Sequence, residues 1–337
     1  MLKIKLIINA VILLCSLLYV YNCRAEDPGD VFSIQFENDF FGGGTDRHFT
    51  HGTRISYLTR PIDWISNAAN SFPWFDLEKA DSPENRIHAR ASVSLGHNIF
   101  TPENIAEYRL ITDDRPYAGW LYMGFGVVGN QGSSRYDKLE LNIGTIGPLS
   151  GAENVQKEWH SFFGLQRPNG WEHQLENELG VVLHYEQARR YGRKDLPYAL
   201  EFDVIPHFGG SIGNVFTHLA AGYTIRLGNN LEDDFGPPRI RPSLPGGEYF
   251  NKENCFNWYL FAGMEGRAVA RNIFLDGNTF SESHSVDKRT WVGDLQAGLA
   301  VQIYRFRITY TQIFRTSEYS GQNSADEFGS LSLSYQF

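Results

Sequence analysis

The last eleven residues of the chain have the pattern of one strand, and from Ser330 to Phe337 they alternate strictly between polar and apolar side chains. Leu331, Leu333, Tyr335 and Phe337 would share one face of an extended strand, and three serines would share the other face with Gln336. This period of two is what a strand requires when one side contacts lipid and the other a polar interior. A terminal aromatic residue at the end of such a strand is also typical of bacterial outer-membrane barrels. The pattern therefore predicts a transmembrane β-strand.

Residues 1–25 have the pattern of a secretory signal peptide. Lys3 and Lys5 precede an apolar run over 7–21, and a small-x-small site ends at Ala25. An uncleaved membrane anchor is the alternative, although the run is shorter than the roughly 20 residues of a spanning helix. We expect residues 26–337 to form one outer-membrane β-barrel enzyme domain.

Charge, cysteine content and hydropathy narrow the class of protein. Cleavage would remove three cations and no acid, which lowers the formal charge from −9 to −12, and such an acidic chain is a poor ligand for nucleic acid. Cys255 would remain as a single cysteine, which cannot form an internal disulfide. The mean hydropathy of −0.34 argues against a helical membrane protein but not against a barrel, because half of each barrel strand is polar.

Alternating segments recur along the chain, and arginines on their polar faces indicate a polar, plugged lumen. We therefore predict an all-β fold, a twelve-stranded antiparallel transmembrane β-barrel with a short helix in an outer loop, since single-chain bacterial barrels have even strand numbers. A soluble β-sandwich is the alternative. The expected strands are 31–41, 51–60, 87–98, 117–130, 135–147, 176–190, 197–209, 215–228, 256–270, 290–302, 304–315 and 327–337.

Strand parity assigns the loops to the two ends of the barrel. With the N-terminus in the periplasm, the proline-rich stretch 228–254 would be periplasmic. The expected outer loops are 42–50, 99–116, 148–175, 210–214, 271–289 and 316–326.

The segment 152–164 departs from the strand pattern and has helical spacing. Val155, Trp159 and Phe162 form an apolar stripe, and Gln156 and His160 project together from one face beside it. A histidine near neutral pH at a lipid-facing rim is a good general base. A solvated surface histidine is the alternative, because the chain contains ten histidines.

Two further polar groups are expected at the same rim. Residues 37–39 (Glu-Asn-Asp) and 46–52 cluster carboxylate, amide and hydroxyl oxygens, which suit a hard cation such as calcium. The same residue types are also common in turns. In the second group, Asp113-Asp114-Arg115, Arg115 could meet a phosphate or form a structural ion pair inside the barrel.

Together these motifs resemble a known family, the outer-membrane lipid A 3′-O-deacylases of the LpxR type. The motifs are Glu37-Asn38-Asp39, the run from Thr45 to Gly52, Asp114 to Trp120, and Gly147-Pro148 through Gln156-x-x-x-His160 to Glu178. The resemblance covers nearly all of the chain after the signal peptide. It implies a twelve-stranded barrel that hydrolyses the 3′-linked acyloxyacyl ester of lipid A with calcium as cofactor.

The resemblance also implies which residues act. The active site would contain Asn38, Asp39, Thr50, Gln156 and His160. His160 would be the general base, and a cation near Asp39 would stabilise the oxyanion. The family has a glutamate six residues after the histidine. This chain has Gln166 there, a neutral and therefore weaker second metal ligand.

The implied partners are lipid A within lipopolysaccharide, the lipids of the bacterial outer membrane, and the barrel assembly machinery, with the active site facing the outer leaflet. One alternative is an outer-membrane phospholipase with a serine beside a histidine at the rim. Ser161 would point away from the His160 face, and Ser211 would lie in the short turn 210–214. A non-enzymatic, porin-like barrel is the other alternative.

Overall fold

The structure is a computed structural model that describes residues 29–39, 48–71, 86–231, 234–237, 239–240, 242, 247–250 and 256–337. The predicted signal peptide over 1–25 and the single cysteine of the predicted mature chain, Cys255, lie outside these residues. No helix in the described ranges has the length and apolar character needed to cross a membrane.

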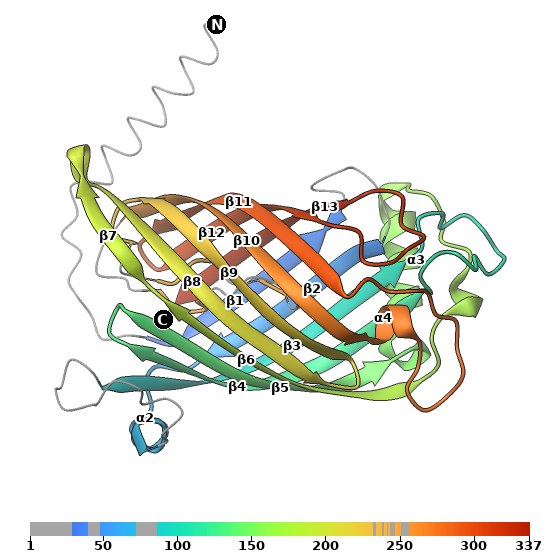
Figure 1. The fold of residues 1–337 in the computed structure, drawn as a ribbon, viewed down its shortest axis with the longest axis horizontal. Helices are drawn as coiled ribbons and strands as arrows, with labels where there is room; N and C mark the ends of the chain where they lie inside the picture. The colour runs from blue at the N-terminus through green and yellow to red at the C-terminus, as the bar shows by residue number, and fades with distance from the viewer. Residues whose placement is uncertain are drawn as a thin grey trace, which may run out of the picture.

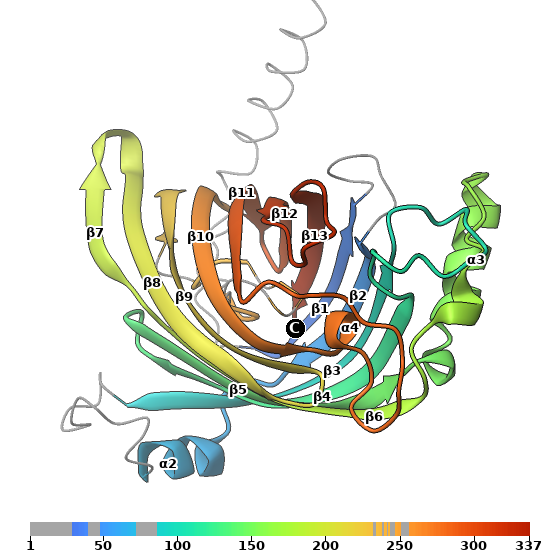
Figure 2. The ribbon, with the colours of Figure 1, turned by 45° about the vertical axis from the view of Figure 1, so that its right-hand side comes forward.

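Twelve antiparallel strands close into a barrel, as the alternation predicted (Figure 1). Closure comes from the pairing of β1 with β13 and of β6 with β8. A thirteenth labelled strand, β7, follows β6 and pairs with β8 in a hairpin beyond the barrel wall (Figure 2). The strands are β1 (Val31–Asn38), β2 (His48–Leu58), β3 (Ile87–Thr101), β4 (Ala118–Gln131), β5 (Arg135–Ile146), β6 (Glu178–Arg189), β7 (Tyr191–Leu196), β8 (Leu200–Gly213), β9 (Phe216–Gly228), β10 (Phe256–Asn272), β11 (Trp291–Ile303), β12 (Phe306–Arg315) and β13 (Asp326–Gln336).

The outer and inner faces of the barrel wall differ in polarity, as the two-residue period of the sequence predicts. On β13, Leu331 and Leu333 are exposed on the outside, whereas Ser330, Ser332 and Ser334 are buried inside. The same alternation places large apolar side chains on the outer face of the other strands. The barrel therefore has a polar interior and an apolar surface suited to lipid.

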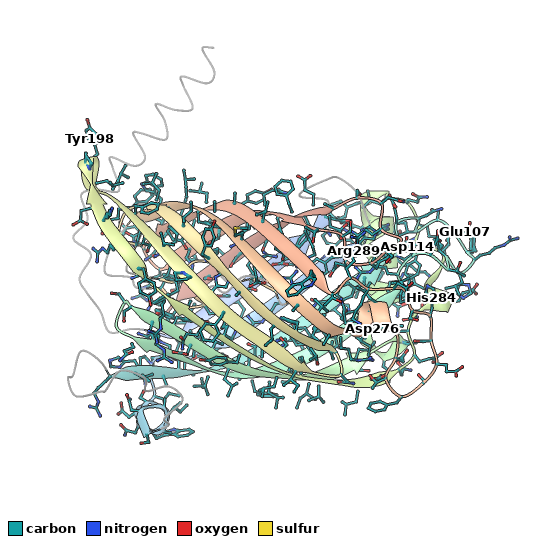
Figure 3. The ribbon with its side chains drawn as sticks, in the orientation of Figure 1. Glu107, Asp114, Tyr198, Asp276, His284 and Arg289 are labelled. Carbon is teal, nitrogen blue, oxygen red and sulfur yellow. The ribbon has the colours of Figure 1, made fainter. Side chains whose placement is uncertain are left out.

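The helices lie at opposite ends of the barrel. α2 (Asp63–Ser71) lies at one end, which we call the α2 rim, and α3 (Ala152–Phe163) and α4 (Ile273–Asp276) lie at the other, the α3 rim (Figure 1). Side-chain views place Tyr198 at the α2 rim and Asp114 and His284 at the α3 rim (Figure 3). Three single 3-10 turns complete the elements: η3 (Pro148–Ser150), η4 (Trp171–His173) and η5 (Pro197–Ala199).

The structure corrects two expectations about loops. The expected turn 210–214 is shorter, because β8 continues to Gly213 and leaves only 214–215 before β9. The stretch 228–254 begins and ends at the α2 rim, but it is not a periplasmic loop. Its described residues 231, 234–237, 239–240 and 247–250 are buried inside the barrel, and we call these residues the luminal segment.

Buried ion pairs hold the luminal segment to the wall. Glu248 accepts from Arg54 on β2 at 2.6 Å, and Arg239 donates to Glu37 on β1 at 2.8 Å. Asp234 accepts from Arg226 on β9 at 2.5 Å. Arginines on inner faces therefore meet acids of the segment, and the predicted plugged lumen is confirmed.

Candidate active site

The helix α3 turns its two candidate catalytic side chains toward the barrel. Gln156 and His160 are 3% and 4% exposed, whereas Val155, Trp159 and Phe162 are 42%, 48% and 83% exposed. A separation of four residues places Gln156 and His160 on one face, as predicted. The apolar stripe therefore faces outward from the rim.

A close approach to the wall fixes the position of α3. A Cβ atom on Gly119 of β4 would lie 2.2 Å from the Ala152 Cβ atom and 2.2 Å from the Ser150 Oγ atom, so only glycine fits there. Ala152 also joins a buried apolar cluster with Tyr117 and Trp171, whose rings lie 4.9 Å apart. This packing holds the first turn of α3 against the strands.

The backbone after α3 orients the His160 ring. Gly164 ends the helix in the left-handed conformation with φ 66°, and the chain then returns so that the Gln166 carbonyl oxygen contacts the His160 Nδ1 atom. A carbonyl oxygen can only accept, so Nδ1 is the donor, and in the neutral ring Nε2 carries the lone pair. The Gln166 side chain is exposed. Gln166, the residue predicted to be a metal ligand, thus orients the His160 ring through its backbone carbonyl. Its side-chain type could not have indicated this role.

One hydrogen bond fixes the orientation of the Gln156 side-chain amide. Its Oε1 atom accepts from the Trp171 Nε1 atom at 2.8 Å, which fixes which end of the amide points to Trp171. The Nε2 group is buried and has no hydrogen-bond partner among the described residues. Because a buried unpaired donor is costly, this N–H group is a candidate ligand contact.

Thr50 lies on a β-bulge. In the ladder between β2 and β3, Phe49 opposes Phe100 and His51 opposes Ile99, so Thr50 is the extra residue. Its carbonyl accepts from the Asn38 Nδ2 atom at 2.7 Å. A second bond, 2.6 Å long, joins the hydroxyl groups of Thr50 and Thr101. The bulge therefore couples two predicted site residues, Asn38 and Thr50.

An aromatic contact links α3 to β2 near the end of β1. The Trp159 ring, adjacent in sequence to His160, lies 6.0 Å from the His51 ring. His51 in turn opposes Asn38 across the β1–β2 ladder. The structure thus gathers Asn38, Thr50 and α3 at one sector of the α3 rim.

The predicted cation ligands, Asp39 and Gln166, stay a prediction. Asp39 follows directly after β1 and contributes a buried carboxylate, an oxygen donor of the kind that calcium prefers. Within the described ranges, no three His, Cys, Asp or Glu side chains group closely enough to hold a metal ion by themselves. Asp46, part of the same motif, lies outside the described residues.

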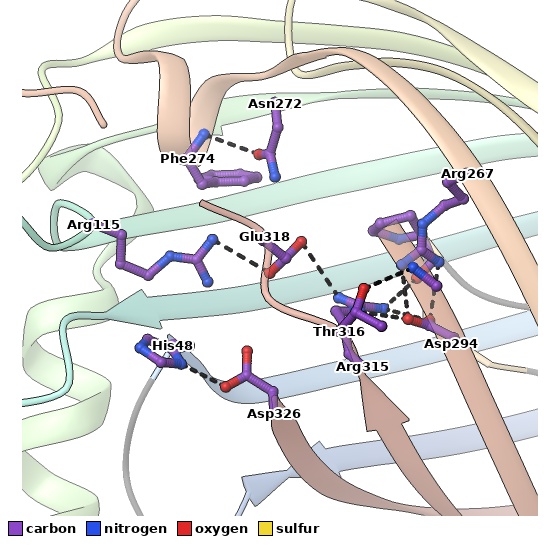
Figure 4. A network of polar contacts seen from close by, with 12 residues as sticks. His48, Arg115, Arg267, Asn272, Phe274, Asp294, Arg315, Thr316, Glu318 and Asp326 are labelled. Atoms are coloured by element: carbon purple, nitrogen blue, oxygen red, sulfur yellow. Dashed lines mark hydrogen bonds and ion pairs between the residues drawn. The ribbon is translucent and has the colours of Figure 1, made fainter. Parts of the chain in front are cut away.

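The second polar group forms an ion pair. Arg115 is 1% exposed and its guanidinium lies 3.5 Å from the Glu318 carboxylate, as Figure 4 shows. Its charge also lies over the rings of Phe100 and Tyr319. Of the two roles open to Arg115, the structural ion pair is therefore the one observed.

Ser211 has a histidine neighbour that the sequence did not reveal. The residue lies on the inner face of β8 and not in a turn, because β8 is longer than expected. Its Oγ atom is 2.6 Å from the His184 Nδ1 atom and 3.5 Å from the His218 Nε2 atom. Ser211, His184 and His218 are all buried on the inner side of the barrel wall.

Comparisons with known proteins agree with this architecture. LpxR from Salmonella typhimurium has the same fold, with a TM-score of 0.73 and 20% sequence identity over 91% of this chain and 100% of that chain. The β domain of the Bordetella autotransporter BrkA also matches, with a TM-score of 0.43 and 10% identity over 93% of this chain and 100% of that chain, a similarity too low to carry an argument. No curated protein matches the sequence.

A family model describes almost the whole sequence. The model of outer membrane protein LpxR matches residues 9–337. This range includes every strand of the barrel, the helix α3 and all the candidate site residues. The chain therefore belongs to the LpxR family of outer membrane proteins.

Proposed function

We propose that this protein is a lipid A 3′-O-deacylase that hydrolyses the 3′-linked acyloxyacyl ester of lipid A. Membership of the LpxR family supports the reaction class. The observation that carries the proposal is the pairing, on the inward face of α3, of an oriented histidine base with the buried, unpartnered Nε2 donor of Gln156. We further propose that the α3 rim faces the outer leaflet, where lipopolysaccharide resides.

In the proposed reaction, the Nε2 atom of His160 removes a proton from water, and that water attacks the acyl carbonyl carbon. The Gln166 carbonyl, by accepting from Nδ1, stabilises the imidazolium that forms. The Nε2 group of Gln156 donates to the developing oxyanion. The ester C–O bond then breaks, and His160 returns its proton to the departing sugar oxygen.

The strand residues position the reactants. The Thr50 hydroxyl on the bulge would orient water or substrate, and the Asn38 amide would help to orient substrate. We also propose calcium as cofactor, held by the Asp39 carboxylate with Gln166 as a weaker second ligand. When bound, the cation would supply Lewis-acid stabilisation of negative charge.

Mass spectrometry of lipid A tests this proposal. Cells would express the wild type, His160→Ala, or the control His88→Ala, which removes an exposed histidine from β3. We expect loss of one acyloxyacyl unit in the wild type and the control but not in His160→Ala. Unchanged lipid A in all three strains, with each barrel present in the outer membrane, would contradict the proposal.

Further measurements test the two alternative functions, a phospholipase and a porin-like barrel. A phospholipase would release fatty acids from glycerophospholipids and would be inhibited by a serine-directed reagent. The geometry in its favour within the described residues is the Ser211–His184 pair, which is buried on the inner side of the wall. A porin-like barrel would give a conductance step in planar bilayers without any lipid product.

A further inference from the structure

The residue that begins β2 has an unusual backbone. His48 has φ 63°, in the left-handed region that non-glycine residues rarely adopt. It stands two residues before Thr50, so the backbone irregularity and the bulge are adjacent. Such a conformation persists only where its surroundings hold it in place, and it often occurs at functional sites.

The loop between β12 and β13 and the first residue of β13 hold the His48 ring. The ring is 1% exposed, and its Nδ1 atom lies 2.5 Å from the Asp326 Oδ1 atom at the start of β13. On its other side, the Nε2 atom lies 2.9 Å from the Tyr319 hydroxyl, in the loop between β12 and β13. Figure 4 shows the ring pointing at Asp326, beside the Arg115–Glu318 ion pair.

The loop between β3 and β4 also contacts the residues that hold His48. The Tyr319 hydroxyl donates to the Asp114 carboxylate in the loop between β3 and β4. Burial and this hydrogen bond raise the pKa of Tyr319, so its hydroxyl stays protonated at neutral pH. The two ring nitrogens of His48 are thus held between the Asp326 carboxylate and the Tyr319 hydroxyl.

Apolar packing holds Phe49, the residue after His48, independently of the contacts that His48 makes. The Phe49 ring lies 5.5 Å from the Phe100 ring and 5.4 Å from the Phe328 ring. Phe49 therefore anchors β2 in the wall, whereas His48 fixes the backbone that enters the bulge. The barrel can accordingly be expected to fold without the His48 side chain.

We propose that His48 is a positioning residue for Thr50, which it holds on the bulge through its contacts with Asp326 and Tyr319. This proposal rests on the proposed function, in which Thr50 orients water or substrate. His48 does not touch the reacting atoms. Its effect on the reaction passes through the placement of Thr50.

The main test is His48→Gly. Glycine adopts a positive φ freely, so the variant tolerates the backbone conformation but loses the side-chain contacts with Asp326, Tyr319 and Gln322 that hold it in place. A misplacement of about 1 Å can lower a rate on the order of 100-fold, so we expect a fall in kcat of that order with little change in KM. Tyr319→Phe, which removes only the hydroxyl, should give a smaller fall in the same direction.

A double-mutant cycle separates positioning from a general structural role. If His48 acts through Thr50, adding His48→Gly to Thr50→Ala should cause no further loss of kcat. Independent, multiplying losses would overturn the proposal. The matched control is Tyr259→Phe, which removes another buried hydroxyl bonded to a carboxylate, Asp234, at 2.8 Å, and should leave kcat unchanged.

Amide hydrogen exchange of the first residues of β2 gives a readout that needs no activity. We expect faster exchange there in His48→Gly, with wild-type protection in the rest of the barrel. Wild-type kcat and wild-type exchange in His48→Gly would refute the positioning role even if His160→Ala abolishes deacylation. If the wild type itself does not deacylate lipid A, the proposed function fails, and exchange alone still shows whether His48 fixes the bulge.

Discussion

Asp234 is the residue whose neutralisation should release the luminal segment. One carboxylate oxygen accepts from Arg226 at 2.5 Å, and the other accepts from Arg307 and from the Tyr259 hydroxyl, each at 2.8 Å. Asp234→Asn keeps the side-chain shape and removes the charge. Two wall arginines then lose an ionised partner inside the barrel.

The contacts that Arg226 and Arg307 keep in Asp234→Asn determine how much stability is lost. Arg226 keeps two bonds to Asp203, at 3.0 and 2.5 Å, so its charge stays compensated. Among the described residues, Arg307 keeps only carbonyl acceptors, Gly247 at 2.9 Å and Tyr249 at 3.4 Å. One buried charge is therefore left without an acid, and breaking a buried pair in this way costs about 3–5 kcal/mol.

We expect the lower end of that range, about 3 kcal/mol, because the asparagine oxygen can still accept one hydrogen bond. At 1.4 kcal/mol per factor of ten, this shifts the equilibrium between the docked and released segment roughly 100-fold. Conductance in planar bilayers measures release directly, and the urea midpoint measures the loss of stability.

The control is Asp195→Asn, the same chemical change at an exposed position on β7. We expect brief openings to be far more frequent in Asp234→Asn than in the wild type or this control. A closed Asp234→Asn barrel whose free energy of unfolding differs from the wild type by less than about 0.5 kcal/mol would refute the reasoning, since that is the usual effect of a neutral surface change.

Four further predictions concern the α3 rim. Gly119→Val should displace α3 by a clash with Ala152 and abolish deacylation, while heat-modifiable migration on gels shows a folded barrel. Trp171→Phe removes the donor that orients Gln156, so kcat should fall about 5-fold with KM unchanged, since such a bond contributes about 1 kcal/mol. Phe162→Ser should reduce turnover of lipopolysaccharide in vesicles but not in detergent, because this exposed ring would contact the membrane. Chelation with EDTA should abolish activity and added calcium should restore it; full activity in excess chelator would remove the metal from the mechanism.

Much of the fold could be predicted from the sequence because its signals are local. The alternation in β13 follows from one wet and one apolar face, and it holds residue by residue in the structure. The spacing of Gln156 and His160, and Gly164 as the stop signal, likewise define α3 and its inward face without knowledge of any partner. Each of these patterns repeats within a few residues along the chain.

The arrangement of the site depends on segments that only the closed barrel brings together. The bulge at Thr50 is a mismatch between two strands, so neither strand alone contains it. His48 meets Asp326 only because β13 returns beside β1, which itself pairs with β2, and the luminal segment turns inward because buried wall arginines need acids. Sequence periodicity thus determined which face of each element is buried, whereas the closure of the barrel decided which buried groups meet, because contacts such as His48–Asp326 join residues far apart in the sequence.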